Sequence, residues 1–427
     1  MKKAIIPILF AVVFALTVGS CRKEEAFKFV PFQDDVFHAW CLATYDLDGD
    51  GELSLRELFI VSEIEVPAYH EGNPVTSLKG IENFVYLERL TCLRNDGLVS
   101  LDLRDLFYLK RLEFNSCSNL TSIDLSGCKR LEYVDCDYNN LSSLHLNGCV
   151  LLKSLSCNFN SLSSLNVSSC PELINFRCHG NNLDRLDISR NQKLDTLSCF
   201  SNRLNALDLT GHSDLRVVFC GDNALKNLDL SKSRGLEVLY CETNQLASMD
   251  ISACPSLKEL VCYTNNIESI IHRYASLEIL SCGYNNLTEL NLSYFENLRQ
   301  LFCENNYLPD LDITGCHSLQ FLDCSYNLLS VLNASDCIEI ERAVCRNNRL
   351  SAVNFRSAKM EILQVSNNSI ETLDISTSPF IEELYFTPNN SLKRIYVNDL
   401  IDVQNLVNAA GKKIDLGGGD KKLLYYK

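Results

Sequence analysis

The stretch Leu155–Leu162, with the sequence LSCNFNSL, decides the fold, because its pattern returns 21 residues later in Phe176–Leu183 as FRCHGNNL. The central cysteine recurs at steps of 21 residues, with one step of 20, in the series Cys136, Cys157, Cys178, Cys199, Cys220, Cys241, Cys262, Cys282, Cys303, Cys324 and Cys345. The series continues outward through Cys92, Phe114, Val365 and Phe386. The period covers residues 84–397 and predicts a solenoid of stacked turns.

Each repeat contains a short strand followed by a turn. Leu155 and Cys157 alternate, so both side chains point to the same, inward side of a strand. Asn160 follows where the chain bends, and its side-chain amide can satisfy the backbone groups left free there. Leu162 and Val167 point back into the same core. No single repeat buries this face alone, so we expect each strand to pair in parallel and in register with the next.

The repeat consensus L-x-C-x-x-N-x-L-x-x-L-D-L-S resembles the leucine-rich repeat, with its second strand leucine exchanged for cysteine. The resemblance implies an α/β-type repeat solenoid, a rod of parallel in-register strands with helical caps at both ends. A rise of about 4.8 Å per turn over about fourteen turns gives a rod of roughly 65 Å. Such a rod has a long face and no deep pocket by default.

The spacing of the 21 cysteines predicts free thiols, although so many cysteines in an exported protein normally suggest disulfides. In-register stacking makes the Cβ vectors of the main column parallel, which is a poor start for a disulfide dihedral. We therefore expect small buried hydrophobic residues. Ligation of a metal by stacked thiolates is the alternative, but it lacks a CxxC pair or a Cys-His cluster. A second column follows the L-D-L-S segment on the opposite side of the coil, at Cys128, Cys149, Cys170, Cys254, Cys316 and Cys337, with Asn191, His212 and Ser233 at equivalent turns.

The N-terminus predicts an exported lipoprotein. Two lysines precede the apolar stretch 4–16, which is too short to span a bilayer. The sequence VGSC that ends at Cys21 resembles a bacterial lipobox, which implies lipidation of this cysteine; an ordinary signal peptide with a chance cysteine is the alternative. The run RKEE over 22–25 resembles the export signal of surface-exposed lipoproteins of the Bacteroidota, or is simply a solvated charge run. We expect an outer membrane lipoprotein exposed at the cell surface.

The segment 46–57, with the sequence DLDGDGELSLRE, fills the twelve positions of an EF-hand calcium loop. The oxygen ligands predicted at positions 1, 3, 5, 7, 9 and 12 are Asp46, Asp48, Asp50, Glu52 through its backbone carbonyl, Ser54 directly or through water, and Glu57. A degenerate acidic turn that has lost its ion is the alternative. Sensors generally use paired EF-hands and only one such loop is present, so we predict a structural Ca²⁺ ion that clips a helical cap onto the first turns.

Charge and the C-terminus complete the domain organisation. The net charge of −15 disfavours binding to nucleic acids or to anionic membrane surfaces, because a polyanion repels phosphates. A helix is expected over 399–410, ending at Gly411, before a strand-like tail. We expect a monomer, held at the membrane by its lipid alone, with these parts: signal peptide 1–20, lipidated tether 21–33, EF-hand cap 34–83, repeat domain 84–397 and C-terminal cap 398–427.

Large aromatic residues recur at outward positions of the central turns. If Leu155 and Cys157 point inward, the residues between and just after them point onto the concave sheet. These positions hold Phe159, His179, Phe200, Phe219, Tyr240, Tyr263, Tyr284, Phe302 and Tyr326, with the acids Asp222, Glu242 and Glu304 among them. We predict ligand binding by the seven aromatic residues from Phe200 to Tyr326, with the three tyrosines 240, 263 and 284 as one continuous platform. Aromatic ladders that only stabilise the sheet are the alternative.

Lipobox, single EF-hand cap and cysteine-rich 21-residue repeat together resemble the leucine-rich-repeat surface lipoproteins of the Bacteroidota, distantly akin to internalin-like and BspA-like proteins. The resemblance implies adhesion to, or recognition of, a protein ligand. Capture of a glycan for a nutrient-uptake system is the alternative, because sugar rings also stack on aromatic faces. The chain has no G-x-S-x-G, no H-E-x-x-H and no phosphate-binding glycine loop, so we expect no enzyme.

Overall fold

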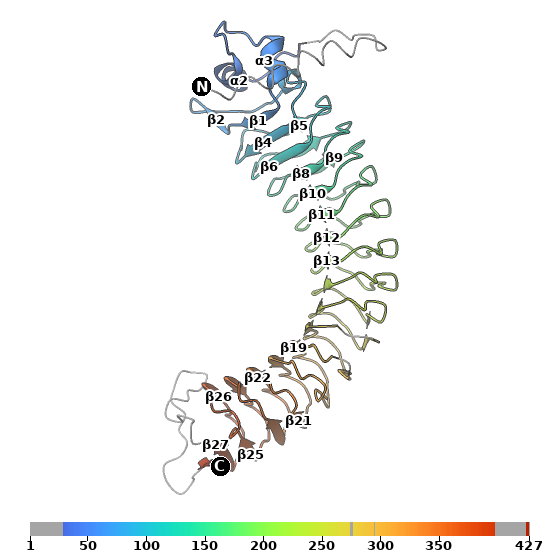
Figure 1. The fold of residues 1–427 in the computed structure, drawn as a ribbon, viewed down its shortest axis with the longest axis vertical. Coiled ribbons are helices and arrows are strands. Elements are labelled where there is room, and N and C mark those ends of the chain that lie inside the picture. Colours follow the sequence, from blue (N-terminus) through green and yellow to red (C-terminus); the bar gives the residue numbers. More distant parts are fainter. Residues whose placement is uncertain (1–28, 274–275, 294, 398–423, 427) are drawn as a thin grey trace, which may run out of the picture.

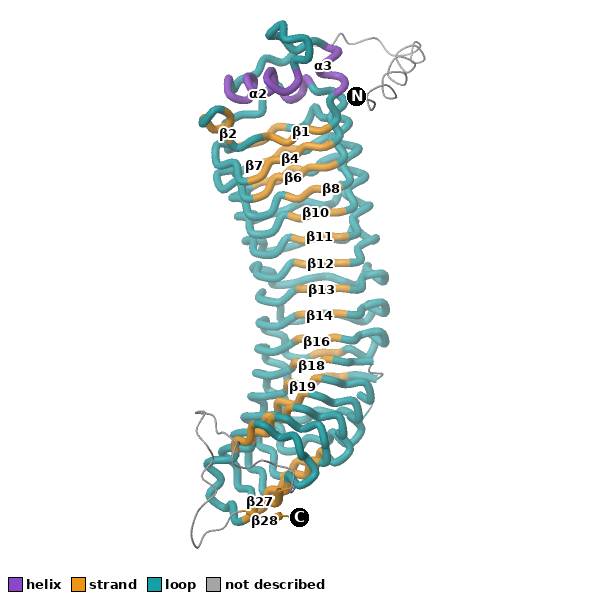
Figure 2. Tube along the Cα trace, turned by 60° about the vertical axis from the view of Figure 1, so that its left-hand side comes forward, coloured by secondary structure: helices purple, strands orange, loops and turns teal. Residues whose placement is uncertain are grey.

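The computed structural model describes residues 29–273, 276–293, 295–397 and 424–426. Sixteen strands form one sheet, all parallel, in the order β1-β4-β6-β8-β10-β11-β12-β13-β14-β16-β18-β19-β20-β22-β24-β26. Figure 1 shows the turns stacked into a curved solenoid whose concave side carries this main sheet, and Figure 2 shows the strands from β1 to β19 one above another. The prediction of a parallel repeat solenoid is confirmed.

The main-sheet strands are short and recur once per turn. They are β1 (Glu63–Val66), β4 (Arg89–Leu93), β6 (Arg111–Asn115), β8 (Tyr133–Asp135), β10 (Ser154–Ser156), β11 (Asn175–Arg177), β12 (Thr196–Ser198), β13 (Val217–Phe219), β14 (Val238–Tyr240), β16 (Glu259–Val261), β18 (Ile279–Ser281), β19 (Gln300–Phe302), β20 (Phe321–Asp323), β22 (Arg342–Val344), β24 (Ile362–Gln364) and β26 (Glu383–Tyr385). Leu155 pairs with Phe176, and Phe176 with Leu197. This register places equivalent positions of successive turns in one column along the solenoid.

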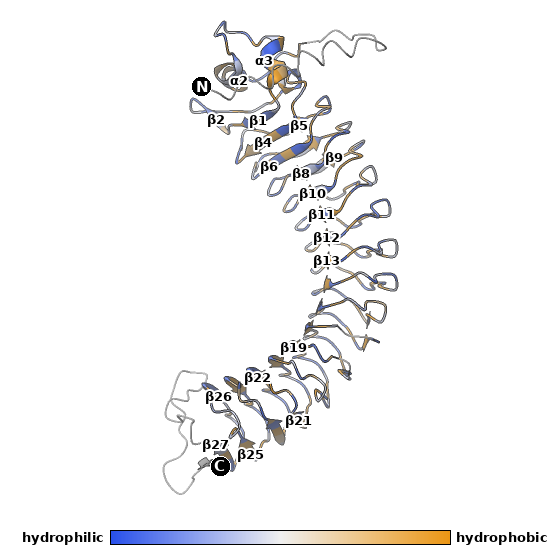
Figure 3. Ribbon diagram, in the orientation of Figure 1, coloured by the Kyte–Doolittle hydropathy of each residue, from blue (hydrophilic) through white to orange (hydrophobic). Residues whose placement is uncertain are grey.

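The core lies behind the main sheet and consists of the inward columns. Leu155 and Cys157 are both buried, and so are their equivalents in the neighbouring turns. All twenty cysteines among the described residues are buried free thiols, as expected from the stacking. Burial raises the pKa of the Cys157 thiol well above its usual value, because a thiolate in the core would lack solvation. Inward and outward residues alternate along the strands, which Figure 3 shows as alternating colours on β4 and β6.

An asparagine at the end of each strand region joins consecutive turns. The side-chain amide of Asn181 donates to the carbonyl oxygen of Cys157 in the preceding turn at 3.0 Å and to that of Cys178 in its own turn at 3.1 Å. Its Oδ1 accepts the N–H of Leu162 at 3.0 Å. Asn160 makes the same set of bonds, which confirms the role expected for its amide at the bend. The asparagine ladder continues through Asn202, Asn223, Asn244, Asn265, Asn285, Asn306, Asn327, Asn348 and Asn368.

The opposite, convex side of the coil has only short ladders. They are β5-β7-β9 (Ser100–Asp102, Ser122–Asp124, Ser143–His145), β15-β17 (Met249–Asp250, Ile270–Ile271), β21-β23 (Val331–Ala334, Ala352–Phe355) and β25-β27-β28 (Thr372–Asp374, Arg394–Val397, Leu424–Tyr426). The second cysteine column is buried here, together with Asn191, His212 and Ser233. The continuous ladder on the other side holds its turns at a spacing of about 4.8 Å. The convex side lacks this constraint, and the solenoid bends away from it (Figure 1).

The N-terminal cap closes one end of the core. It contains α2 (Asp35–Tyr45), α3 (Leu55–Ile60), the 3-10 helix η1 (Ile81–Asn83) and an antiparallel hairpin of β2 (Tyr69–His70) and β3 (Asn73–Pro74). The Asp34 side chain accepts the N–H of Phe37 at 2.8 Å, which caps α2, and the N–H of Thr76 at 2.6 Å. Phe37 and Leu58 are fully buried against the first turns. The predicted helical N-terminal cap is therefore present.

Several predicted features lie outside the described residues. These are the signal peptide 1–20, Cys21 with most of the tether, and the helix expected over 399–410. Of the predicted C-terminal cap only β28 is described, and it pairs with β27. Within the described parts of the chain, no helix combines the length and the apolar character needed to cross a membrane.

Candidate functional site

The outward residues of the main sheet form four columns on the concave face. The first outward column precedes the inward leucine, the second lies between leucine and cysteine, and the third follows the cysteine; in one turn these are Ser154, Ser156 and Asn158. The next residue, here Phe159, begins the bend, and we call its column the rim column. Its backbone is left-handed in turn after turn, with φ of 51° at Phe159 and 52° at Tyr284.

The seven predicted binding residues are spread over three of these columns. Phe219, Tyr240 and Phe302 lie in the second column, Phe200 and Tyr263 in the third, and Tyr284 and Tyr326 in the rim column. The exposed fraction is 38% for Tyr263, 56% for Tyr284 and 47% for Tyr326, whereas the other four are partly buried.

The prediction of one continuous tyrosine platform is wrong. In the sheet Tyr240 stands beside Val261, not beside Tyr263. Tyr263 lies one column further along its turn, and Tyr284 lies at the bend. The three rings therefore step diagonally across the concave face instead of stacking along one column.

A stack of aromatic rings does exist, but it begins nearer the N-terminus. The rings of Tyr138 and Phe159 stack with centroids 4.7 Å apart, Phe159 meets His179 edge-on at 4.8 Å, and His179 stacks on Phe200 at 4.6 Å. Burial within this stack lowers the pKa of His179, because the charged imidazolium is poorly solvated there. Here the aromatic residues cover one another, which supports the stabilising-ladder alternative for this part of the face.

A second, shorter group lies in the second outward column. The rings of Phe219 and Tyr240 meet edge-on with centroids 5.1 Å apart. The Tyr240 hydroxyl donates to a carboxylate oxygen of Glu259 at 2.8 Å. Burial, reinforced by this carboxylate, raises the pKa of Tyr240 to about 12. Phe219 ends β13 and Tyr240 ends β14, so the sheet positions this second group.

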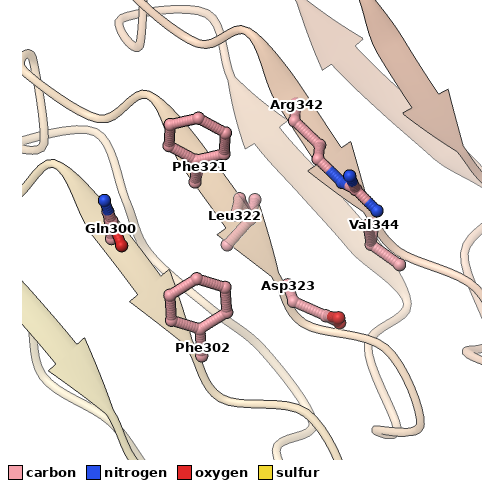
Figure 4. A pocket seen from close by; sticks show the side chains of 7 residues that line it. All are labelled: Gln300, Phe302, Phe321, Leu322, Asp323, Arg342 and Val344. Carbon is pink, nitrogen blue, oxygen red and sulfur yellow. The ribbon is translucent and has the colours of Figure 1, made fainter.

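The concave face is hollowed between β19, β20 and β22, as Figure 4 shows. The hollow has a volume of about 330 Å³ and is lined by Gln300, Phe302, Phe321, Leu322, Asp323, Arg342 and Val344. Phe321 stands beside Arg342 in the first outward column, and Phe302 beside Asp323 in the second. Two apolar rings and two opposite charges thus border a space that suits one large side chain of a partner.

Two glutamates in the third outward column have poorly satisfied carboxylates. The Oε2 atoms of Glu242 and Glu304 are buried and have no hydrogen-bond partner. Burial raises the pKa of both carboxyl groups, a hydrogen bond from each residue's own backbone N–H opposes this, and a neighbouring acid, Asp222 for the first and Asp323 for the second, adds to the rise. One oxygen of each carboxylate therefore lacks the donor that buried polar atoms normally have.

The loop between α2 and α3 draws acidic side chains together. Carboxylate oxygens of Asp46, Asp48 and Asp50 all lie within 4.8 Å of one another. The Asp46 side chain accepts the N–H of Gly49 at 2.7 Å and that of Gly51 at 2.9 Å. Gly51 has a φ of 85°, in the left-handed region that glycine adopts without strain. This donor set of clustered carboxylates fits a hard cation such as Ca²⁺.

The last position of the loop is fixed by α3. Glu57 is buried, accepts the N–H of Leu47 at 2.7 Å, and forms a capping box with Ser54 at the start of the helix. The Ser54 hydroxyl, with the backbone N–H groups of Leu47 and Ser54, lowers the pKa of Glu57 to about 2. The carboxylate at the twelfth position is thus ionised and held at the base of the loop.

No protein-family model matches the chain, and no curated protein does. Solved structures do match. The functional domain of InlJ from Listeria monocytogenes, which includes a cysteine ladder, has a TM-score of 0.64 at 22% identity, over 89% of this chain and 78% of that one. A leucine-rich-repeat protein of Leptospira interrogans has a TM-score of 0.62 at 21% identity, over 73% of this chain and 85% of that one. The plant peptide hormone receptor RGFR1, solved in complex with RGF2, has a TM-score of 0.54 at 18% identity, over 82% of this chain and 63% of that one.

The chain has the leucine-rich-repeat fold. In this leucine-rich-repeat solenoid the sequence missed two residues of the concave face. Phe321, which borders the hollow, lies in the first outward column, directly before the inward Leu322, and the predicted row took only positions after the inward leucine. Tyr138, which begins the ring stack, lies one turn before the predicted row. The alternation on both sides of the inward leucine was the signal that could have found Phe321.

Proposed function

We propose that this protein is a cell-surface lipoprotein that binds a protein ligand through the concave face of its leucine-rich-repeat solenoid. The observation that carries the proposal is the uncovered main sheet. Half-exposed aromatic residues and a hollow lie on it, and among the described residues no helix or strand lies across it (Figure 1). Exposed aromatic residues on a rigid surface commonly mark a binding site.

The matched structures support a binding role over a catalytic one. RGFR1 was solved with RGF2 bound, and the matched part of InlJ is its functional domain. The concave face offers hydrogen-bonding, charged and aromatic groups in fixed columns, which is what recognition of another chain requires. Anchoring through Cys21 and an outer membrane location belong to the same proposal and rest on the N-terminal sequence. The proposal also includes a monomeric state.

A structural Ca²⁺ ion in the N-terminal cap completes the proposal. Asp46, Asp48 and Asp50 would hold it with their side chains, joined by Glu57, by the Glu52 carbonyl and by Ser54. The ion would neutralise the repulsion between carboxylates that the loop brings within 4.8 Å of one another. Its role would be to fix α2 and α3 on the end of the core.

The full-length protein, purified in detergent, can be tested on a protein array and on a glycan array. We expect protein ligands whose binding is lost in the triple variant Tyr263→Ser, Tyr284→Ser, Tyr326→Ser, because these exposed rings lie on the concave face. The matched control is Tyr69→Ser with Tyr307→Ser, which removes exposed tyrosines outside the four outward columns. Binding to glycans alone would favour the nutrient-capture alternative, and protein binding that survives the triple variant would place the site elsewhere.

A further inference from the structure

The concave face changes its charge along the solenoid. Over the seven strands β12, β13, β14, β16, β18, β19 and β20, the four outward columns contain no lysine, arginine or histidine. The same columns contain five acids, which are Asp222, Glu242, Glu259, Glu304 and Asp323. Arg177 precedes this stretch, and Arg342 and Arg346 follow it. We call the stretch from Thr196 to Tyr326 the acidic segment of the concave face.

Basic residues along the edge of the sheet that borders the acidic segment are already paired. They lie just before the first outward column, at the edge of the sheet, and each forms an ion pair with an acid of a neighbouring turn. Arg216 pairs with Asp195, Lys258 with Glu237 at 2.9 Å and Arg299 with Glu278 at 3.8 Å. These pairs neutralise the edge and leave the charge of the concave acids uncompensated by the described chain.

Three of the five acids have hydroxyl donors and two do not. Asp222 accepts a hydrogen bond from Ser201 at 2.6 Å, Glu259 accepts one from Tyr240, and Asp323 accepts one from Ser325. Glu242 and Glu304 differ, because each has one carboxylate oxygen that is buried without any donor. The negative charge of these two carboxylates is therefore less well compensated within the protein than that of the other three acids.

Glycines position these two carboxylates. Gly221 and Gly283 occupy the third outward column one turn before Glu242 and Glu304, respectively. A Cβ at Gly221 would stand 2.6 Å from the Glu242 carboxylate, and a Cβ at Gly283 would overlap the Glu304 carboxylate in the same way. Each carboxylate therefore occupies space that the Cβ of any residue other than glycine would fill. The same arrangement occurs twice, on either side of Tyr263.

We propose that the acidic segment binds an extended segment of another protein through two of its lysine or arginine side chains, one at Glu242 and one at Glu304, with a large apolar side chain next to the second in the hollow. This inference deepens the proposed function and rests on it. Both glutamate side chains are only partly buried, so a cationic group can approach each carboxylate, pair with it and match the charge of the face. The hollow at Phe302 and Phe321 adjoins Glu304, because Phe302 ends β19 and Glu304 follows it two residues later.

The geometry fixes the spacing of the two basic residues. Glu242 and Glu304 are three turns apart, which corresponds to about 14 Å at a spacing of about 4.8 Å per turn. An extended chain advances about 3.3 Å per residue. The partner segment therefore carries its basic residues four positions apart and runs along the solenoid axis.

Binding can be measured by fluorescence anisotropy with the full-length protein in detergent. The probe is a labelled peptide with two lysines four residues apart and a phenylalanine after the second lysine. The comparison peptides replace both lysines by glutamate, or move them to adjacent positions. We expect the first peptide to bind, binding to weaken as salt rises, and both comparison peptides to bind at least about tenfold more weakly.

Two sets of variants link this binding to the two carboxylates. Glu242→Gln with Glu304→Gln should weaken binding of the lysine peptide about tenfold or more. Glu268→Gln with Glu289→Gln removes two exposed acids outside the outward columns and should leave binding of this peptide within about twofold of the parent. Gly221→Ala with Gly283→Ala should also weaken it, because the carboxylates must move while the net charge stays the same. Gly211→Ala, where an added Cβ meets nothing, is the control.

The outcomes separate this inference from the proposed function. Equal binding of the lysine and glutamate peptides, or no effect of the double glutamine variant, would overturn the inference. If protein ligands from the array still depend on the exposed tyrosines in that case, the concave face binds proteins without recognising two cations. If the arrays yield no protein ligand and the lysine peptide does not bind, both fail.

Discussion

Inward and outward positions of the same strands differ in how much they vary from turn to turn. The inward column that contains Cys157 holds cysteine in eleven consecutive turns, and the asparagine ladder is equally regular. The third outward column, one residue away, holds asparagine, histidine, phenylalanine, glycine, glutamate and tyrosine within six turns, from Asn158 to Tyr263. Stacking requires the inward residues to be alike, whereas the outward residues are free to differ. Function is therefore expected where the repeat is least regular.

The largest expected effect on stability comes from breaking a contact between turns on the inward side of the strands. Asn265→Ala removes an amide that donates to the carbonyls of Cys241 and Cys262, both at 3.1 Å, and accepts the N–H of Leu246. Leaving these buried backbone groups without partners should lower the free energy of unfolding by about 3 kcal/mol. Asn266→Ala, at the exposed neighbouring position, should change it by less than about 0.5 kcal/mol. Chemical denaturation of both variants checks this; similar losses would contradict the comparison.

Removal of calcium tests whether the stability of the core depends on the N-terminal cap that covers one of its ends. If the cap holds Ca²⁺, free Ca²⁺ at about 100 times its Kd stabilises the protein by about 2.7 kcal/mol, so EDTA should lower the Tm. Glu57→Gln should abolish this response, because it removes the charged ligand at the twelfth position. Glu52→Gln is the matched control, since that residue contributes its backbone carbonyl. Melting curves that are identical with and without Ca²⁺ would remove the ion from the proposal.

A smaller effect, of opposite sign, is expected where an inward column is irregular. Asn191 and His212 interrupt the second cysteine column, and the Asn191 Oδ1 and His212 Nδ1 atoms are buried without partners. Replacing both residues by cysteine removes two unsatisfied acceptors, and the new thiols can bond the carbonyls of Val167 and Ile188 that Asn191 and His212 now bond, as Cys149 Sγ donates to the Leu125 carbonyl at 3.4 Å, so stability should rise by about 1 kcal/mol. The reverse change, Cys149→Asn, should lower it. A double variant less stable than the parent would mean that the polar pair has partners in solution, such as a bound water.

The smallest effect is expected at the outward tyrosines. Tyr263→Ser and Tyr284→Ser should each change the free energy of unfolding by less than about 0.5 kcal/mol, because both side chains are exposed. Phe219→Ser should cost more, about 1 kcal/mol, since its ring packs on Tyr240. Denaturation in urea measures these differences. A large loss at Tyr263 would show that the outward columns are structural as well.

The positions of the inward residues could be predicted from the sequence, because burial constrains them. The arrangement of the outward residues could not, because burial does not constrain it. Leu155, Cys157 and Asn160 could be placed because only one arrangement buries the leucine and cysteine and bends the chain at the asparagine. Tyr263 and Tyr284 were grouped in one row, although they follow their column cysteines, Cys262 and Cys282, by one and by two residues. Their separation depends on the left-handed residue that begins the bend.

The two distinctive carboxylates show a second limit of the sequence. Glu242 and Glu304 were visible as acids among aromatic residues. Their buried oxygens depend on glycines one turn earlier, which touch them only after the turns have stacked. The EF-hand loop is the opposite case, because all its proposed ligands lie within twelve residues and their spacing is readable directly. Local sites are accessible from sequence, whereas sites assembled between turns require the fold.

The asparagine ladder also bears on how such a protein changes its length over generations. Every asparagine contacts only its own turn and the one before it, so the gain or loss of a whole repeat leaves each bond with an equivalent partner. Steps of 20 residues are tolerated as well: Asn285 and Asn368 follow shortened repeats and still donate to the carbonyls of Cys262 and Cys345 at 3.0 Å. Duplication or deletion inside the gene can thus lengthen or shorten the concave face without any new interface having to evolve. Descendants of one ancestor can therefore differ in reach while sharing the same turn.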